Sequence, residues 1–229
     1  SETNGISFVD AGLQVNEYIL FDPINGSFTE PLLSGKIKNQ NIHGLPSYEM
    51  IIVSHPNFLT QAERLAEYHR QFDNMSVLVL TPPEVYNEFS SGLPDVSGIR
   101  NMFRYFYSRN NNSLTPLRYV LLMGDGSYNN RKFDGTKNNF IPTYQSVNSI
   151  NKGDSYVMDD FYGLLDENEG ESIGMLDIGI GRIPCKTSNE AENVIDKIIN
   201  YSQSFGEWRN VVCFIADDQD GNEFMDDSE

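Results

Sequence analysis

The sequence predicts a three-layer α/β domain, in which a doubly wound, mainly parallel sheet with an added β-hairpin lies between two layers of helices. Short apolar runs alternate with segments of helical periodicity from residue 50 to residue 216, which is the order typical of βαβ units. The apolar runs are continuous in Val, Ile and Leu, as in strands that are buried on both faces. The 229 residues, of which 39% are hydrophobic and 12% aromatic, can fill such a core.

The segment 1–48 lacks this alternation, and we interpret it as a connecting segment or the end of a preceding domain, with one strand at 18–21. The domain itself is expected over residues 49–229. A strand at 50–53 precedes a helix at 59–72, for which Thr60 is the expected N-cap because Glu63 follows three positions later as its capping-box partner. The next expected elements are a strand at 76–80, helices at 83–89 and 96–108, and a strand at 119–123.

A polar stretch, 124–152, separates these elements from the rest of the chain. Two apolar runs, 161–165 and 176–183, flank an acidic turn and predict the hairpin. A helix at 189–203 and a strand at 211–216 complete the pattern. Because a core strand so close to Glu229 has no helix returning across the sheet, we expect the intact protein to continue beyond this residue.

The charge balance excludes some classes of partner. Asp and Glu number 33 against 16 Lys and Arg, a net charge of −17 that repels a phosphate backbone and argues against nucleic acid. No apolar stretch approaches the ~20 residues that span a bilayer, and the segment 1–9 lacks the pattern of a signal peptide. The two cysteines are too few for a disulfide scaffold and lack the spacing of metal ligands.

Residues after the strands are the first candidates for chemistry, because ligands bind at the carboxyl ends of parallel strands. His55 can exchange a proton near neutral pH, or it can simply bond a nearby carbonyl in a turn. Asp125 stands between two glycines, where it can bind a cation or a phosphate, or can cap Ser127 or Tyr128. This turn has neither the Lys of a P-loop nor a complete GxGxxG pattern. His43 and His69 do not follow a strand.

Acidic clusters suggest calcium, which prefers carboxylate and carbonyl oxygens. The tract 217–229 fails the EF-hand pattern, because placing Gly221 at the sixth position puts Ala216 first and Asp227 last. A solvated acidic surface is the alternative there, and also at 166–171, where the carboxylates repel one another unless a cation is bound.

Neither cysteine has the environment expected of a nucleophile. A catalytic thiol needs a nearby base, and no histidine follows His69 in the sequence. Cys185 would therefore need a histidine from across the sheet. Cys213 stands inside an apolar run and is expected to be an inert core residue.

Several phrases together resemble the gingipain-type cysteine peptidases, in both order and spacing. They are YVLLMGD (119–125), DFYG (160–163), DIGIGRIP (177–184), EAENVIDKIINY (190–201) and WRNVVCFIA (208–216). A closer resemblance, to the sortases of the type IX secretion system, is carried by MIIVSHPNFLTQAERLAEYHR (50–70), VYNEFSSGLPD (85–95), GDGSYNN (124–130), IPTYQS (141–146) and ADDQDGN (216–222). The resemblance covers residues 50–222, most of the chain.

The resemblance implies a caspase-like fold of two subdomains, of which this chain is the first. It places the catalytic Cys and His downstream, in the second subdomain. Asp218, with Asp217 next in line, matches an acidic residue that orients the catalytic histidine in gingipains, a role suited to a carboxylate. Both cysteines match positions outside the catalytic motif. Calcium is implied, but no organic cofactor, and the candidate calcium ligands are Asp159, Asp160, Asp166 and Asp218.

The implied function is that of a cysteine endopeptidase or sortase that removes the C-terminal sorting domain of exported proteins and transfers the cargo to surface lipopolysaccharide. This chain alone is expected to be inactive. The implied partners are protein or peptide substrates, the missing second subdomain and outer-membrane components of the secretion system, and the implied location is the cell surface. One alternative is a non-catalytic α/β scaffold or binding module that keeps the half-fold. Another is an ordinary doubly wound protein with a receiver-like or phosphate site at Asp125.

Overall fold

The computed structural model describes residues 9, 21–22, 24–26, 35–37, 39–109, 113–130, 139–148, 150–151, 153–170 and 173–213. Contacts divide the chain into two units, Ser1–Asn39 and Gln40–Glu229. In the first unit, Asp22 accepts hydrogen bonds from the backbone N–H groups of Ile24 and Asn25 and so closes a turn. Of the strand expected at 18–21, only Phe21 lies among the described residues, and it is not in a strand.

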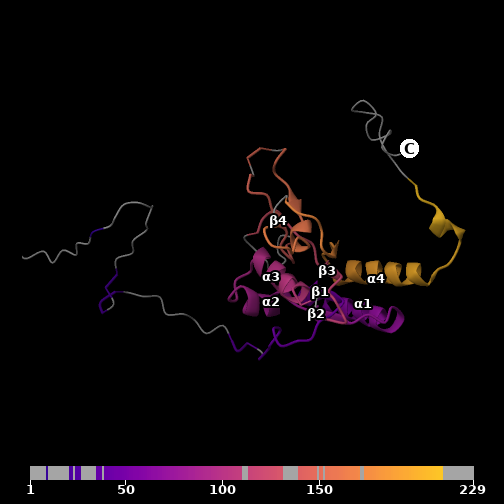
Figure 1. Ribbon diagram of the computed structural model, residues 1–229, viewed down its shortest axis with the longest axis horizontal. Coiled ribbons are helices and arrows are strands. Elements are labelled where there is room, and N and C mark those ends of the chain that lie inside the picture. The colour runs from indigo at the N-terminus through magenta and orange to yellow at the C-terminus, as the bar shows by residue number, and fades with distance from the viewer. Residues whose placement is uncertain are drawn as a thin grey trace, which may run out of the picture. The chain divides into compact units, whose positions relative to one another are not determined.

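The described part of the second unit contains a four-stranded parallel sheet with the strand order β2-β1-β3-β6 (Figure 1). Its strands are β1 (Met50–Ser54), β2 (Val77–Leu80), β3 (Tyr119–Met123) and β6 (Gly179–Ile183). The chain moves outward from β1 to β2 and then crosses back to β3 on the other side of β1. This reversal makes the sheet doubly wound, as the sequence predicts.

Helices cover both faces of the sheet (Figure 1). They are α1 (Leu59–Phe72) and α4 (Ser188–Gln203) on one face, and α2 (Pro82–Phe89) and α3 (Val96–Tyr107) on the other. Alternate residues of β1 separate the two cores, because Ile51 and Val53 pack in the cluster of α2 and α3 whereas Ile52 packs with α1 and α4. Every β1 residue is buried, which explains its continuous apolar sequence.

The start of α1 differs from the prediction. The helix begins at Leu59, with Phe58 as its N-cap, so Thr60 is not the cap. A short 3₁₀ helix, Pro56–Phe58, comes first, and the His55 ring accepts a hydrogen bond from the Asn57 N–H there. The capping-box prediction was wrong because Pro56, which is suited to the first position of a helix, already begins the helical turn before Thr60.

The hairpin also lies elsewhere than predicted. The antiparallel pair consists of β4 (Tyr144–Gln145) and β5 (Val157–Met158). The run at 161–165 contains a 3₁₀ helix, Asp160–Tyr162, and the run at 176–183 supplies β6, which pairs in parallel with β3. The first run is apolar because its side chains are buried, mostly in the core beside α3, and not because it forms a strand.

The strand predicted at 211–216 is not formed in the part of it that the structure describes. Val211 and Val212 are about three-quarters exposed, at 73% and 72%, and Cys213 is also exposed. The prediction of a buried core cysteine at 213 was therefore wrong for this structure. An apolar run becomes a buried strand only beside a partner, and residues 211–213 follow a 3₁₀ helix, Glu207–Asn210, without entering the sheet.

Residues 40–43 are attached to α2 by one carboxylate, that of Glu88. It accepts hydrogen bonds from the backbone N–H of Ile42 (2.7 and 2.8 Å), the Gln40 amide (2.9 Å) and the His43 ring (2.7 Å). Burial alone would raise the pKa of Glu88, but these hydrogen bonds outweigh it and hold the pKa at about 2. Ile42 is buried as a result. The domain boundary expected after residue 48 stays a prediction.

Glu88→Gln should destabilise the domain by roughly 2–3 kcal/mol at pH 7, because the native state binds the ionised carboxylate more strongly than the unfolded state does. A lowered native pKa stabilises above the unfolded value, so this contribution is complete above about pH 5 and falls as the pH drops toward 2. Urea unfolding at pH 7 and pH 3 checks it, and the difference from wild type should narrow to about half at pH 3. Glu63→Gln, at an exposed ion pair with Arg70, is the control and should cost under about 0.5 kcal/mol. A difference for Glu88→Gln that does not change with pH would contradict the prediction.

Candidate ligand-binding edge of the sheet

The carboxyl ends of the strands meet along one edge of the sheet, where the residues after β1, β3 and β6 are held together by backbone hydrogen bonds. The His55 N–H donates to the Met123 carbonyl, and the Gly124 N–H donates to the Ile183 carbonyl, each at 3.0 Å. The Asp125 N–H donates to the Cys185 carbonyl, also at 3.0 Å. The sequence-predicted candidates His55, Asp125 and Cys185 therefore lie on neighbouring segments of this edge.

Residues 140–141 cover the turn after β3. The Phe140 and Ile141 N–H groups donate to the Asp125 carbonyl at 2.9 and 3.2 Å. Gly124 has a φ of +141°, and a Cβ there would lie 2.8 Å from the Phe140 Cβ. A glycine is therefore required at this position by both conformation and space.

The Asp125 side chain is engaged within the turn. Its Oδ1 accepts a hydrogen bond from the Gly126 N–H at 3.0 Å, and its Oδ2 lies 3.4 Å from the Lys186 Nζ. Asp125 therefore caps Gly126, and not Ser127 or Tyr128. Lys186 provides the lysine that sequence reasoning did not place near this turn, because it comes much later in the chain, after β6. The negative charge of the Asp125 carboxylate is therefore balanced by the ammonium group of Lys186.

Arg182 of β6 holds this edge together. Its guanidinium makes a two-point ion pair with Asp159, with both N–O distances at 2.7 Å. It also donates to the carbonyls of Gly124 (2.8 Å), Ile141 (3.0 Å) and Pro142 (3.1 Å). The Arg182 side chain is only 11% exposed. Sequence reasoning missed this residue. Its signal was a positive charge inside the otherwise uncharged run IGIGRIP (178–184), because a strongly buried charge needs specific partners.

An apolar cavity of about 240 Å³ lies at the tips of β1 and β2. Among the described residues it is lined by His55, Phe140, Tyr86, Asn87, Gly92 and four prolines, Pro56, Pro82, Pro83 and Pro94. The His55 Nδ1 accepts the Asn57 N–H at 3.3 Å, so the neutral ring carries its proton on Nε2. Burial lowers the pKa of His55, which favours the neutral ring. His55 therefore caps a helical turn, whereas the turn interpretation of the sequence had it bonding a carbonyl.

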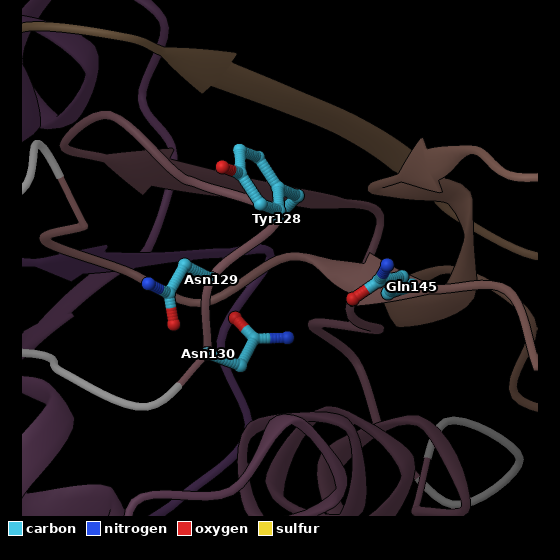
Figure 2. A pocket seen from close by; sticks show the side chains of 4 residues that line it. All are labelled: Tyr128, Asn129, Asn130 and Gln145. Carbon is cyan, nitrogen blue, oxygen red and sulfur yellow. The ribbon is translucent and has the colours of Figure 1, made fainter. Parts of the chain in front are cut away.

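A second cavity, of about 460 Å³, lies beyond the turn after β3. Figure 2 shows the four described residues that line it, Tyr128, Asn129 and Asn130 from the segment after β3 and Gln145 from β4. All four side chains are neutral and can form hydrogen bonds. The described lining can therefore select a ligand by hydrogen bonds.

The other two histidines are paired with carboxylates away from this edge. The His43 ring lies 2.7 Å from Glu88 and stacks on Phe89. The His69 ring lies 2.6 Å from Asp73, one helical turn later. The carboxylate partners of these two rings, Glu88 and Asp73, do not belong to the described residues that follow the strands.

Three of the predicted calcium ligands, Asp159, Asp160 and Asp166, lie among the described residues. Asp159 gives both oxygens to Arg182, and Asp160 and Asp166 are exposed. Within the described ranges, no three His, Cys, Asp or Glu residues form a group that could hold a metal ion. Asp217 and Asp218 lie outside the described residues, so the histidine-orienting role of Asp218 and its part in binding calcium stay predictions.

The acidic turn at 166–171 has a cation of its own. The Arg100 guanidinium donates to the carbonyls of Leu164 and Glu169. Asp177 accepts the N–H groups of Leu165 and Asp166, at 2.7 and 3.1 Å. The described residues of this turn are therefore ordered by an arginine and by backbone hydrogen bonds, which the sequence argument for a metal did not foresee.

Cys185 is buried, with 2% exposure, and burial raises the pKa of its thiol to about 11. The thiolate is the nucleophile, so this environment disfavours catalysis. The next residue, Lys186, directs its ammonium at Asp125, which compensates the charge that would otherwise favour a thiolate. The structural interpretation of Cys185 therefore agrees with the geometry.

In a Cys213→Ser variant, iodoacetamide should modify Cys185 at least ~100-fold more slowly at pH 8 in the folded protein than in urea, because the raised pKa reduces the thiolate population by about two orders of magnitude. Intact mass against time measures both rates. Equal rates in the folded and unfolded protein would mean that Cys185 is accessible and activated.

Comparisons with known proteins agree on one family. The model of peptidase family C25 matches residues 43–229. Among solved structures, the dimeric latent form of PorU from Porphyromonas gingivalis is 35% identical, with a TM-score of 0.68, over 84% of this chain and 20% of that chain. The present chain thus spans about a fifth of that protein's length. A comparison with curated proteins found no match.

Proposed function

The chain belongs to peptidase family C25, and we propose that in the intact protein it forms the first subdomain of a gingipain-like cysteine endopeptidase that processes the C-terminal sorting domain of exported proteins. The observation that carries this proposal is the match to the family model over residues 43–229, joined to the structural likeness to PorU. The peptidase class follows from the family, whereas the sorting-domain substrate is our inference for this chain.

The described residues provide a scaffold for the chemistry, but Cys185 and the three histidines do not form a pair of nucleophile and base. Cys185 is buried with a raised thiol pKa, and the neutral His55 is occupied by Asn57 at Nδ1. The rings of His43 and His69 are paired with carboxylates. We therefore infer that the chain is inactive alone and that the catalytic Cys and His follow it in the intact protein.

The proposed reaction begins with attack of a cysteine thiolate on the carbonyl at the cargo–sorting-domain junction. The amide bond breaks, the histidine protonates the leaving amine, and the cargo is left as a thioester. In transfer, an amine of surface lipopolysaccharide attacks the thioester, forms a new amide and restores the thiol. In hydrolysis, water gives a carboxylate instead. Asp218 would orient the histidine and stabilise its charged form.

The location and partners follow from this proposal. A protein that processes cargo after type IX secretion works at the cell surface, where it meets protein substrates and outer-membrane components of the secretion system. Along the described stretches of the chain, no helix is both long and apolar enough to cross a membrane.

Labelling of the intact protein with an irreversible, thiol-directed peptidyl inhibitor tests the proposal. We expect one adduct, on a cysteine beyond Glu229, and no adduct when residues 1–229 are treated alone. Asp218→Asn should lower the labelling rate of the intact protein by at least tenfold, whereas the control Asp196→Asn on α4 should not change it. An intact, folded protein in which no cysteine reacts would support the non-catalytic scaffold instead, and labelling at Cys185 would place the active site elsewhere.

A further inference from the structure

The cavity at Tyr128, Asn129, Asn130 and Gln145 has a described lining of neutral side chains that can form hydrogen bonds. Its volume of about 460 Å³ lies in the range of small-molecule sites. None of its described lining residues is charged. The described lining therefore offers an ionic ligand no opposite charge in place of its hydration. The geometry points to a neutral ligand that is rich in hydrogen-bonding groups.

Two buried acceptors beside the cavity lack a donor. The Asn130 Nδ2 donates to the Thr143 carbonyl at 3.0 Å, and the Asn139 Nδ2 donates to the Asn129 carbonyl at 2.9 Å. These bonds fix which end of each amide is nitrogen, since turning either amide over would place two oxygens together. The Oδ1 atoms of Asn130 and Asn139 are then buried without any hydrogen-bond partner among the described residues.

An acceptor left in this state destabilises the folded protein, and a donor would remove that penalty. Figure 2 shows the Asn130 oxygen turned toward the side of the cavity where Tyr128 and Asn129 lie, and its nitrogen turned toward Gln145. After a small rotation of the Asn130 amide, a ligand with O–H or N–H groups can therefore donate a hydrogen bond to the Asn130 Oδ1.

The lining favours a saccharide over a polypeptide. Each amide side chain presents a donor and an acceptor in one plane, and neighbouring sugar hydroxyls, which are both donors and acceptors, match this pair. Tyr128 adds an aromatic ring that is 73% exposed, a flat apolar surface of the kind on which the C–H face of a sugar ring packs. A bound peptide chain would instead seek a run of backbone groups.

We propose that this cavity is a binding subsite for a neutral saccharide, outside the cysteine chemistry of the peptidase. Gln145 and Asn130 would bond adjacent hydroxyl groups, and Tyr128 would pack against the ring. The position of Asn129 would be set by Asn139 through its backbone carbonyl. This inference stands on the lining of the cavity and does not depend on peptidase activity.

Saturation-transfer NMR on the intact protein tests the proposal with three neutral sugars, galactose, mannose and N-acetylglucosamine, and with the blocked dipeptide N-acetyl-Gly-Gly-N-methylamide. At least one sugar should bind, and Tyr128→Ala and Gln145→Ala should each weaken its Kd about three- to tenfold, as the loss of one neutral hydrogen bond or packing contact predicts. Phe72→Ala and Gln71→Ala, an exposed aromatic and an amide on α1, are the matched controls and should change nothing.

Two results would overturn the saccharide assignment. Binding of the blocked dipeptide alone, weakened by the same two variants, would make the cavity a polypeptide site. Sugar binding that Tyr128→Ala and Gln145→Ala leave unchanged, or no binding of any sugar, would remove the cavity from consideration. Each outcome is independent of labelling by the peptidyl inhibitor, so this proposal and the proposed peptidase can fail separately.

Discussion

Arg182→Ala should lower the free energy of unfolding by about 3–5 kcal/mol, the range observed when one partner of a buried ion pair is removed. The loss has two parts. Asp159 keeps a carboxylate without its two-point partner, and the carbonyls of Gly124, Ile141 and Pro142 lose their donor. Urea unfolding followed by circular dichroism measures the effect, with the midpoint falling and the slope unchanged.

Two further variants separate the charge from the geometry at Arg182. Lysine keeps the charge but cannot make the bidentate pair and three carbonyl contacts at once, so Arg182→Lys should recover less than half of the loss. The double variant Arg182→Met with Asp159→Leu removes both charges and should be more stable than Arg182→Ala, since no unpaired carboxylate is left. A cost below about 1 kcal/mol for Arg182→Ala would show that the loops at 124 and 141 do not depend on this guanidinium.

The central sheet and its helices could be predicted because their signals are local. The apolar runs that became β1, β2 and β3 are each buried, at least in part, on both faces, and the helix periodicities matched α1, α3 and α4 within one or two positions. Their alternation predicted the doubly wound α/β class that the structure confirms, and the family resemblance added the caspase-like fold.

The misplaced hairpin was predicted because burial and strand formation produce the same apolar pattern. Phe161, Tyr162 and Leu165 have the pattern of a strand but are apolar because they pack in the core beside α3. The run that became β6 was assigned to a hairpin because nothing local says which strand it pairs with. Strand pairing depends on the whole sheet, and β6 pairs in parallel with the side of β3 that β1 does not occupy.

The contacts at the candidate edge could not be predicted because they join segments that are distant in the sequence. Lys186 reaches Asp125, and Arg182 reaches both Asp159 and the loop at 141–142. The orphan oxygens of Asn130 and Asn139 are likewise visible only once the neighbouring carbonyls are placed. Sequence reasoning could identify which residues follow the strands, but not which distant side chains balance their charges or form hydrogen bonds with them.

Gly124→Ala should destabilise the domain by roughly 2–5 kcal/mol, because it combines two costs that can be separated. A residue with a side chain is strained at a φ of +141°, by about 1–3 kcal/mol, and the new Cβ would lie 2.8 Å from the Phe140 Cβ, where overpacking adds a similar amount. Urea unfolding measures the sum.

Gly92→Ala isolates the first cost. Gly92 has a φ of +82°, but a Cβ there meets nothing closer than the Asn87 Oδ1, at 3.8 Å, so its loss should be smaller by the overpacking contribution. Because Phe140 is held by the hydrogen bond of its N–H to the Asp125 carbonyl, it cannot withdraw from Gly124 without opening the turn after β3. If Gly124→Ala cost no more stability than Gly92→Ala, Phe140 would have to move away from the new Cβ without a penalty. The packing of Phe140 on this turn would then not be what holds the edge of the sheet in place.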